Sequence, residues 1–584
     1  MPLLFSEKMK KIKHLLNEKR GYCLLILLLI FSVFQYSIER IYVFFLYPDE
    51  FGYWSAAATA LGWDWKGISG LGSFYSFGYS LWLIPLLKLI PDSLTAYRGA
   101  IAVNMLLMCL SFFLLKRLAE KLLPGKEEKI QLFIAAVAVF YPAWIFYMQF
   151  TATEALLFFL FTLLTLLTLS FLEKPGVWTA LGMALVSGYG FMVHMRFVGA
   201  AAACVLTIAL WGLVQSGNRK KLLLLAAALV AVFLLAFFLK TIVRENVYSG
   251  TGEDVLKHNE FGGQLGKLAY IFTVRGAGQL LKNFSGKLLY MGTASMGLFY
   301  YGLFWCVQEG ISLVRQLRKG KAVAAKTFLA LFLFLALAAG LAISSVYSVQ
   351  NKELDWIIYG RYSEFVLPVM LVAGLVWLYR QKKRLLSMAL AWLCHTVVSM
   401  ICFISFLDAP VQEIRGYMSV SLSWLMGEKT VDPILFLFQV WIWGSLILFL
   451  ISFGIAVVRR KNNLVWILGL ILAGEIFLGL EASHKYIYPV NEYMRYDLHM
   501  GELILADMQE EEVLYLDEGR TQWIDMLQMQ LRERTIQVIS GEELAERARE
   551  GTVLILHKDG GYREAAAGFY THCKEYNVFC LYYN

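Results

Sequence analysis

The sequence is poor in charged residues and in proline. Only 17% of its 584 residues are Asp, Glu, Lys or Arg and only 11 are proline, whereas average soluble domains carry about 25% charged residues. Together with 59% hydrophobic residues, this deficit excludes a soluble globular chain and predicts a polytopic membrane protein. The formal net charge of +9 does not indicate a nucleic-acid partner, because Lys and Arg fall in short clusters between apolar runs.

Several chemical signatures are also missing. His and Cys show no zinc-site spacing, and most of the eight cysteines lie within apolar runs, where a thiol acts as a small hydrophobe. Only Cys573 and Cys580 fall in a polar segment, where a disulfide is an option. The absence of an internal repeat weakens the interpretation as an inverted-repeat transporter. The first apolar run follows basic residues without a small-residue cleavage site, so we expect a retained signal anchor.

The apolar runs predict a bundle of membrane-spanning helices. A spanning helix needs about 20 mostly apolar residues. Runs of this kind predict about thirteen spans, at 22–46, 94–115, 130–149, 153–172, 177–194, 197–214, 222–240, 290–314, 327–346, 363–379, 385–406, 434–458 and 463–480. The run 76–90 is shorter and contains Pro85 and Lys88, so we expect an interfacial or re-entrant helix there.

The distribution of Lys and Arg predicts the orientation of these spans. With the N-terminal segment 1–21 in the cytoplasm, the connections rich in Lys and Arg become cytoplasmic, as the positive-inside rule requires. The first loop (47–93), the long loop 241–289 and the tail 481–584 then share the outer face. Because ATP and nucleotide sugars are not available there, a transfer reaction would need an activated donor delivered by the membrane. We expect an integral protein of a bacterial plasma membrane.

The tail changes composition abruptly and predicts a small external α/β domain. Strand patterns alternate with helical patterns along it. The expected strands are 511–517, 535–540, 552–557 and 578–583, and the expected helices are 523–534, 542–550 and 562–576. The tail has neither a glycine-rich phosphate loop nor a nucleophile elbow. We therefore expect an accessory or acceptor-binding domain, following a transmembrane domain over 22–480.

Three acidic residues are candidates for chemistry. Asp49 and Glu50 lie beside aromatic residues directly after the first span, where the membrane penalises buried charge. An ordinary solvated loop is the alternative interpretation. Glu154 begins the fourth span, and its short side chain cannot reach far toward water, although capping of a helix N-terminus would also explain an acid at this position.

In the predicted orientation, cationic residues also lie at the outer ends of spans. They are Arg98, His194, Arg196 and Arg361. The alternative interpretation of each is that its side chain extends toward lipid headgroups. Transfer of a sugar from a lipid phosphate needs a base for the acceptor proton and cations for the departing phosphate, which the planar fork of arginine binds well. A divalent cation (Mg²⁺, Mn²⁺ or Ca²⁺) held by Asp49 and Glu50 is a further option.

The order of these motifs resembles a known superfamily. Asp49-Glu50 with Tyr53, the segment 77–85, Tyr97-Arg98, Tyr141-Pro142-Ala143, Thr153-Glu154 and Gly360-Arg361-Tyr362 with Pro368 follow one another over most of the first 380 residues. In this layout the chain resembles the GT-C superfamily of membrane glycosyltransferases. It is similar to protein O-mannosyltransferases and to the aminoarabinose transferases that modify lipid A.

The resemblance implies an activity and a set of roles. It implies inverting transfer of a hexosyl or pentosyl group from a polyprenyl-phosphate donor to a glycan, lipid or protein on the outer face. Asp49 would be the base and Glu50 its neighbour or a metal ligand, although which of these two acids is the base stays open. Arg98 and Arg361 would bind the donor phosphate. Glu154, His194, Arg196, Tyr53 and Tyr362 would orient the substrates or the base. A flippase for lipid-linked saccharides and a surface polysaccharide polymerase or ligase remain the alternatives.

Overall fold

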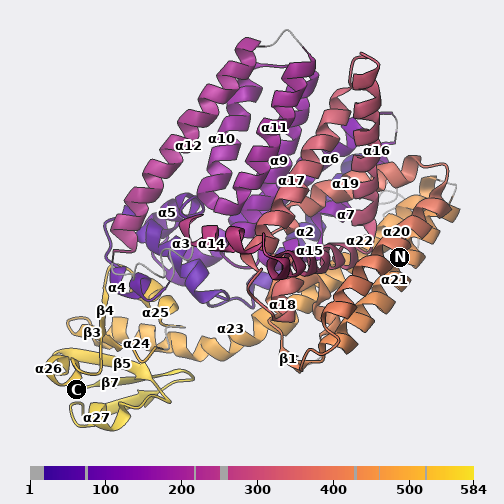
Figure 1. The fold of residues 1–584 in the computed structure, drawn as a ribbon. Coiled ribbons are helices and arrows are strands. Elements are labelled where there is room, and N and C mark those ends of the chain that lie inside the picture. Colours follow the sequence, from indigo (N-terminus) through magenta and orange to yellow (C-terminus); the bar gives the residue numbers. More distant parts are fainter. Residues whose placement is uncertain are drawn as a thin grey trace, which may run out of the picture.

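The protein consists of a large helical bundle and a small C-terminal domain that contains a sheet (Figure 1). The computed structural model describes residues 19–72, 76–125, 127–215, 219–249, 261–426, 430–458, 461–519 and 523–584. Most of the N-terminal segment expected in the cytoplasm lies outside these ranges. The predicted fold class, a polytopic helical membrane protein with a small α/β domain, is confirmed.

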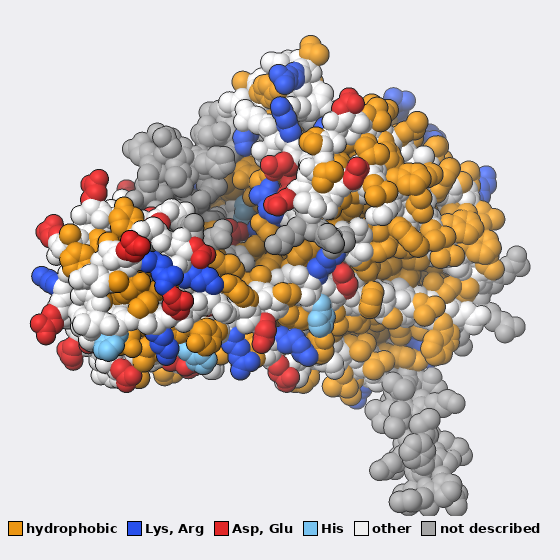
Figure 2. Space-filling view, turned by 90° about the horizontal axis from the view of Figure 1, so that it is seen from below, with side chains coloured by type: hydrophobic (Ala, Val, Ile, Leu, Met, Phe, Trp, Pro, Cys, Tyr) orange, Lys and Arg blue, Asp and Glu red, His pale blue; other side chains and the backbone are white. Residues whose placement is uncertain are grey.

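Within the described ranges, nine helical segments are long and apolar enough to cross a membrane. They coincide largely with α2 (Lys19–Ile38), α6 (Ser93–Leu122), α9 (Thr153–Glu173), α11 (Val198–Val214), α12 (Arg219–Val247), α17 (Ala325–Tyr347), α20 (Arg384–Ser405) and α21 (Pro433–Val457), and the last begins within α22 (Lys461–Ala482) and continues to Asp507. Each coincides with one of the spans predicted from the sequence. Seen from below, the helical part is covered mainly by hydrophobic side chains, whereas charged side chains gather most densely on the C-terminal domain (Figure 2).

The four other predicted spans are shorter or interrupted helices. The third is divided into α7 (Glu128–Val139) and α8 (Pro142–Tyr147), because proline disfavours a helical conformation of the residue before it. The eighth is divided between α15 (Val274–Ala294) and α16 (Leu298–Arg318) by two residues with positive φ, Met296 at 54° and Gly297 at 81°. The fifth and tenth correspond to α10 (Val177–Val193) and α19 (Leu367–Arg380), with 17 and 14 residues.

The connection 241–289, predicted as a long outer loop, is largely helical. The helix α12 continues to Val247, and α14 (Phe261–Tyr270) and α15 follow, while 250–260 lie outside the described residues. The helix α15 buries one face, including Asn283, Lys287 and Tyr290. Polar residues lie between the apolar residues of this helix, so its sequence contains no continuous apolar run that would reveal it.

The first loop folds into three short helices, the first of which carries the candidate acids. They are α3 (Tyr47–Ala60), α4 (Lys66–Gly70) and α5 (Ser80–Leu89). Pro48 lies in the first turn of α3 together with Asp49 and Glu50, and both proline and acidic residues are favourable there. The short helix predicted over 76–90 is confirmed as the ten residues of α5.

The C-terminal domain is reached through α23 (Tyr488–Met494) and α24 (Leu498–Asp507) and contains a sheet of order β4-β3-β5-β7-β6. Its strands are β3 (Glu512–Leu516), β4 (Ile536–Ile539), β5 (Thr552–His557), β6 (His572–Glu575) and β7 (Phe579–Tyr583). All four predicted strands are confirmed. The helix predicted over 562–576 is wrong beyond α27 (Arg563–Ala567), because Gly568 follows that helix and the edge strand β6 forms next. Cys573 and Cys580 are both free thiols.

The C-terminal domain packs directly against the first loop. Its helix α25 (Ile524–Leu531) begins after Trp523, whose ring centre lies 4.1 Å from that of Tyr47 at the start of α3. At the other end of α25, Arg532 donates hydrogen bonds to the carbonyl oxygens of Leu87 and Ile90 at the C-terminus of α5. Because arginine satisfies exposed carbonyl groups at helix C-termini, this contact anchors the domain to the loop that carries Asp49.

Candidate active site

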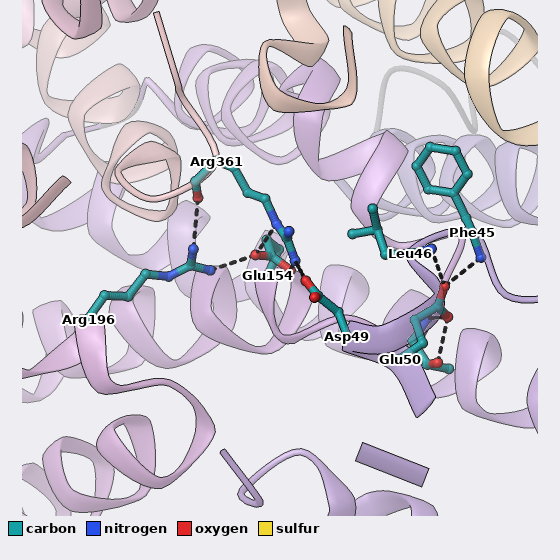
Figure 3. Close-up of polar contacts among 8 residues, drawn as sticks. Phe45, Leu46, Asp49, Glu50, Glu154, Arg196 and Arg361 are labelled. Atoms are coloured by element: carbon teal, nitrogen blue, oxygen red, sulfur yellow. Dashed lines mark hydrogen bonds and ion pairs between the residues drawn. The ribbon is translucent and has the colours of Figure 1, made fainter. Parts of the chain in front are cut away.

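Three segments that are distant in sequence meet at the side chain of Arg361. This residue lies between α18 (Leu354–Ile357) and the 3₁₀ turn η2 (Glu364–Val366). Its Nε donates to Oε1 of Glu154 at 2.8 Å, and its Nη2 donates to Oδ2 of Asp49 at 2.8 Å (Figure 3). The first turn of α3, the first turn of α9 and the segment before η2 therefore form one site.

A second arginine completes this network. Arg196 lies in the 3₁₀ turn η1 (Met195–Phe197), and its Nη2 donates to Oε1 of Glu154 at 2.7 Å. Its Nη1 also donates to the backbone carbonyl of Arg361 at 3.3 Å. Glu154 thus holds both guanidinium groups, and the contact with the backbone carbonyl fixes the segment that carries Arg361. We call Asp49, Glu154, Arg196 and Arg361 the charge network.

The charge network is buried at one end and accessible at the other. The side chains of Glu154, Arg196 and Arg361 are 2%, 3% and 9% exposed, whereas that of Asp49 is 27% exposed. Buried charges are tolerated when they are paired, and here two carboxylates balance two guanidinium groups. Asp49 is therefore the member of the network that a substrate can reach most directly.

Arg361 is held as a cation with donor capacity to spare. Burial opposes its charged form, but the carboxylates of Glu154 and Asp49 outweigh burial and raise the pKa of Arg361 well above its ordinary value. Its Nε and Nη2 bind these carboxylates, and its Nη1 has no hydrogen-bond partner among the described residues. A phosphate oxygen could accept a hydrogen bond from Nη1 without displacing Glu154.

Glu50 points away from the charge network, although it follows Asp49 directly (Figure 3). The backbone N–H groups of Phe45 and Leu46 donate to its Oε1, and Oε2 accepts from the Tyr97 hydroxyl and from both the backbone N–H and the hydroxyl of Thr151. The side chain is completely buried, and burial raises the pKa of Glu50 against the opposing effect of these hydrogen bonds. Glu50 therefore fixes the entry into α3 and is not accessible to a substrate.

The donor set does not suit the divalent cation that the sequence left as an option. The described residues contain no group of three or more His, Cys, Asp or Glu side chains that could hold a metal ion. The oxygens of Glu50 are already occupied by five hydrogen-bond donors, and Asp49 faces the guanidinium group of Arg361. Replacing these donors with a cation would require both acids to change partners.

The three remaining residues expected to orient substrates also lie beside the charge network. Tyr53 is buried one turn after Asp49, and burial followed by the charges of Asp49 and Glu154 raises its pKa well above the ordinary value. The ring of Tyr362 lies 5.0 Å from the guanidinium carbon of Arg196 and 5.8 Å from the ring of His194. Burial and the Arg196 cation lower the pKa of His194, which favours its neutral form.

Arg98 is, after Glu50, the second predicted site residue that the structure does not bring to the charge network. Its Nε donates to the backbone carbonyl of Ile41 at 3.0 Å, and its guanidinium group lies over the ring of Tyr42. The preceding residue, Tyr97, instead points to Glu50. Because successive residues of a helix point in different directions, only one of this pair can face the first-loop acids.

Glu364 was not among the site residues predicted from the sequence. This carboxylate is completely buried and accepts hydrogen bonds from the hydroxyls of Tyr141 (2.9 Å), Tyr147 (3.0 Å) and Tyr290. It lies in η2, three residues after Arg361, so the three tyrosines fix the turn that presents this arginine. An acid at the start of an apolar run was the signal that identified Glu154, and the same signal is present at Glu364.

Comparisons with known proteins identify the fold. No protein-family model and no curated protein matches the sequence. ArnT from Cupriavidus metallidurans, solved bound to undecaprenyl phosphate, is similar in structure with a TM-score of 0.56 and 12% identity over 96% of this chain and 98% of that one. The apo form of ArnT gives a TM-score of 0.53 and 13% identity over 96% and 97% of the two chains. The chain therefore has the fold of ArnT, in agreement with the fold class that its sequence predicts.

Proposed function

We propose that the protein is a membrane glycosyltransferase that moves a sugar from a polyprenyl-phosphate donor to an acceptor on the extracytoplasmic face. The observation that carries this proposal is the contact between the partly exposed Asp49 and the buried Arg361. It places a carboxylate that can accept a proton next to a cation that can bind a phosphate. The ArnT structure with bound undecaprenyl phosphate supports a lipid phosphate as the donor class.

The reaction follows from the positions of these groups. The acceptor hydroxyl attacks the anomeric carbon of the donor while its proton passes to Asp49. The bond between the anomeric carbon and the phosphate oxygen breaks, and the polyprenyl phosphate leaves with both bonding electrons. Arg361 stabilises the negative charge that develops on this leaving group, and Arg196 holds the backbone of Arg361 in place. Attack opposite the leaving group inverts the anomeric configuration.

Asp49 can change partner without leaving the site. In the structure its Oδ2 accepts from Nη2 of Arg361. A donor phosphate that binds this guanidinium group would compete with Asp49 for Nη2, and Glu154 would keep Arg361 in position through Nε. Binding of the donor would thereby free the carboxylate to accept the proton of the acceptor.

The test is a transfer assay with the full-length protein in lipid nanodiscs. Undecaprenyl-phosphate sugars are supplied one at a time, with lipid and glycan acceptors, and products are identified by mass spectrometry. We expect one donor to yield free undecaprenyl phosphate and a glycosylated acceptor, with loss of both products in Asp49→Asn. Full turnover by Asp49→Asn would overturn the assigned role of Asp49. Movement of a labelled lipid-linked saccharide across vesicles without bond cleavage would instead support the flippase alternative.

A further inference from the structure

A second cationic cluster lies beside the first span, apart from the charge network. Tyr42 lies in the connection from α2 to α3. The guanidinium carbon of Arg98, from α6, lies 5.1 Å from the centre of its ring, and that of Arg495, from the 3₁₀ turn η6 (Arg495–Asp497), lies 4.6 Å from it. A single aromatic ring therefore holds two positive groups from segments that are about 400 positions apart in the sequence.

These two arginines have no acidic partner in the described part of the chain. No described carboxylate forms an ion pair with Arg98 or Arg495, and Arg98 donates a hydrogen bond only through its Nε, to the carbonyl of Ile41. One ring attracts both cations, but the cations repel each other. An anion that accepts hydrogen bonds from both guanidinium groups would turn this repulsion into attraction.

The cluster lies at the boundary of the apolar part of the bundle. The 30 residues of α6 correspond to a length of about 45 Å, which exceeds the hydrocarbon core of about 30 Å. Positions 99–115 of this helix carry no charge, Arg98 precedes them and Lys116 follows them. Arg40 lies two residues after the end of α2, and its guanidinium carbon lies 4.0 Å from the ring centre of Tyr36. Tyrosine and arginine together are typical of the depth at which lipid headgroups lie.

We propose that Arg98 and Arg495, held by Tyr42, bind the phosphate of an anionic membrane phospholipid. Arginine matches phosphate because two of its N–H groups can bind two oxygens, and the terminal amino groups of both residues have no partner among the described residues. The occupant is a resident lipid rather than the glycosyl donor, because neither arginine contacts a member of the charge network.

The bound lipid would support the segment that leads to the first-loop acids. Arg98 binds the carbonyl of Ile41, and Asn491 accepts from the backbone N–H groups of Tyr42 (2.7 Å) and Val43 (2.8 Å). The same segment ends in the two backbone N–H groups that hold Glu50. A lipid that neutralises Arg98 and Arg495 would therefore stabilise this connection and raise the thermal stability of the protein.

The experiment compares lipid binding by two variants with the same kind of substitution. Arg98→Gln/Arg495→Gln removes both cations, and Arg117→Gln removes a cation at the opposite end of α6. Native mass spectrometry and thermal unfolding in detergent are measured with phosphatidylglycerol and with phosphatidylcholine. We expect phosphatidylglycerol to bind and stabilise the wild type and Arg117→Gln. We expect affinity to fall about 30-fold in the double variant, the factor for two lost arginine contacts with an anionic lipid surface.

Three results would overturn the proposal. They are equal binding of phosphatidylglycerol by the double variant and the wild type, the same stabilisation by inorganic phosphate alone, and displacement of the lipid by undecaprenyl phosphate in equimolar competition. The last result would assign the site to the donor.

If the double variant does not fold, Arg495→Gln is measured alone. Arg495 is exposed, and we expect its loss to weaken binding about fivefold.

Discussion

Nη2 of Arg361 lies 2.8 Å from Oδ2 of Asp49, although 312 positions separate the two residues in the sequence. This contact connects the group proposed to take the acceptor proton with the group proposed to bind the donor phosphate. Through Glu154 it also extends to Arg196, so a change at any of the four positions affects the others.

The two neighbouring acids of the first loop should respond differently to replacement by the amide. Asp49→Asn keeps the size of the side chain and its contact with Arg361 but removes the base. We expect a loss of transfer activity of about 100-fold or more with only a small change in the unfolding midpoint, because Asp49 is the partly exposed member of the charge network. The measurement is the rate of sugar transfer together with thermal unfolding in detergent.

Glu50→Gln serves as the matched comparison. Its amide nitrogen cannot accept the hydrogen bonds that one carboxylate oxygen of Glu50 now receives, so at least two donors lose their acceptor. Each buried donor without a partner costs about 1–3 kcal/mol, so we expect a clear decrease in the unfolding midpoint. A normal midpoint combined with complete loss of transfer would instead indicate that Glu50 is the base.

The buried part of the charge network should show strong coupling between its members. Glu154→Gln leaves two buried guanidinium groups without a full counter-charge, and removal of one partner of a buried ion pair costs about 3–5 kcal/mol. Glu154→Gln/Arg196→Gln restores the charge balance around Arg361. We expect the double variant to be more stable than Glu154→Gln alone, as measured by thermal unfolding. Additive losses from the two single substitutions would contradict a shared network.

The four residues of the charge network are all among the site residues predicted from the sequence, but Glu50 and Arg98 were predicted with them and bind other partners. The sequence identified Asp49, Glu154, Arg196 and Arg361 because each lies at the end of an apolar run. A charged side chain is costly near the membrane interior, so such a residue is a candidate for function. The expected orientation placed all four on one face, and in the structure they are in contact. The fold class could be predicted for the same reason, since long apolar runs allow few alternatives.

The parts that could not be predicted depend on helix rotation and on distant packing. At the start of α6 the sequence does not determine whether Tyr97 or Arg98 faces the first-loop acids, because they are consecutive residues of one helix. The tyrosines that surround Glu364 come from α8, α15 and the break before α8, and no local pattern connects them. The helix α15 was missed because polar residues interrupt its apolar positions.

Removal of divalent cations should leave the transfer reaction unchanged. The acids of the first loop are occupied by Arg361 and by five hydrogen-bond donors, so a cation would have to displace them. We expect the same transfer rate in excess EDTA as in buffer with Mg²⁺ or Mn²⁺, and the measurement is initial rate against free metal concentration. A rate that disappears in EDTA and returns with one metal would show that Asp49 and Glu50 rearrange to bind it.

Lys287 should make the stability of the protein depend on pH. Its side chain is completely buried in α15, which is not among the candidate spans, and its Nζ donates to the carbonyl of Trp356 at 3.1 Å and the hydroxyl of Ser348 at 3.3 Å. Burial without an acidic partner lowers the pKa of Lys287 from 10.5 to about 7. Between these values the unfolded chain binds a proton that the folded protein does not, so stability increases as the pH rises through this interval.

Lys287→Met removes this dependence because it keeps the length of the side chain and cannot be charged. We expect the unfolding midpoint of the wild type to rise relative to that of Lys287→Met between pH 6 and pH 9. Two pH units above the lowered pKa correspond to about 2–3 kcal/mol. The exposed Lys352→Met makes the same change in charge and should follow the wild type across the whole interval. Parallel curves for the wild type and Lys287→Met would mean that Lys287 remains charged in the folded protein and has an anionic partner there.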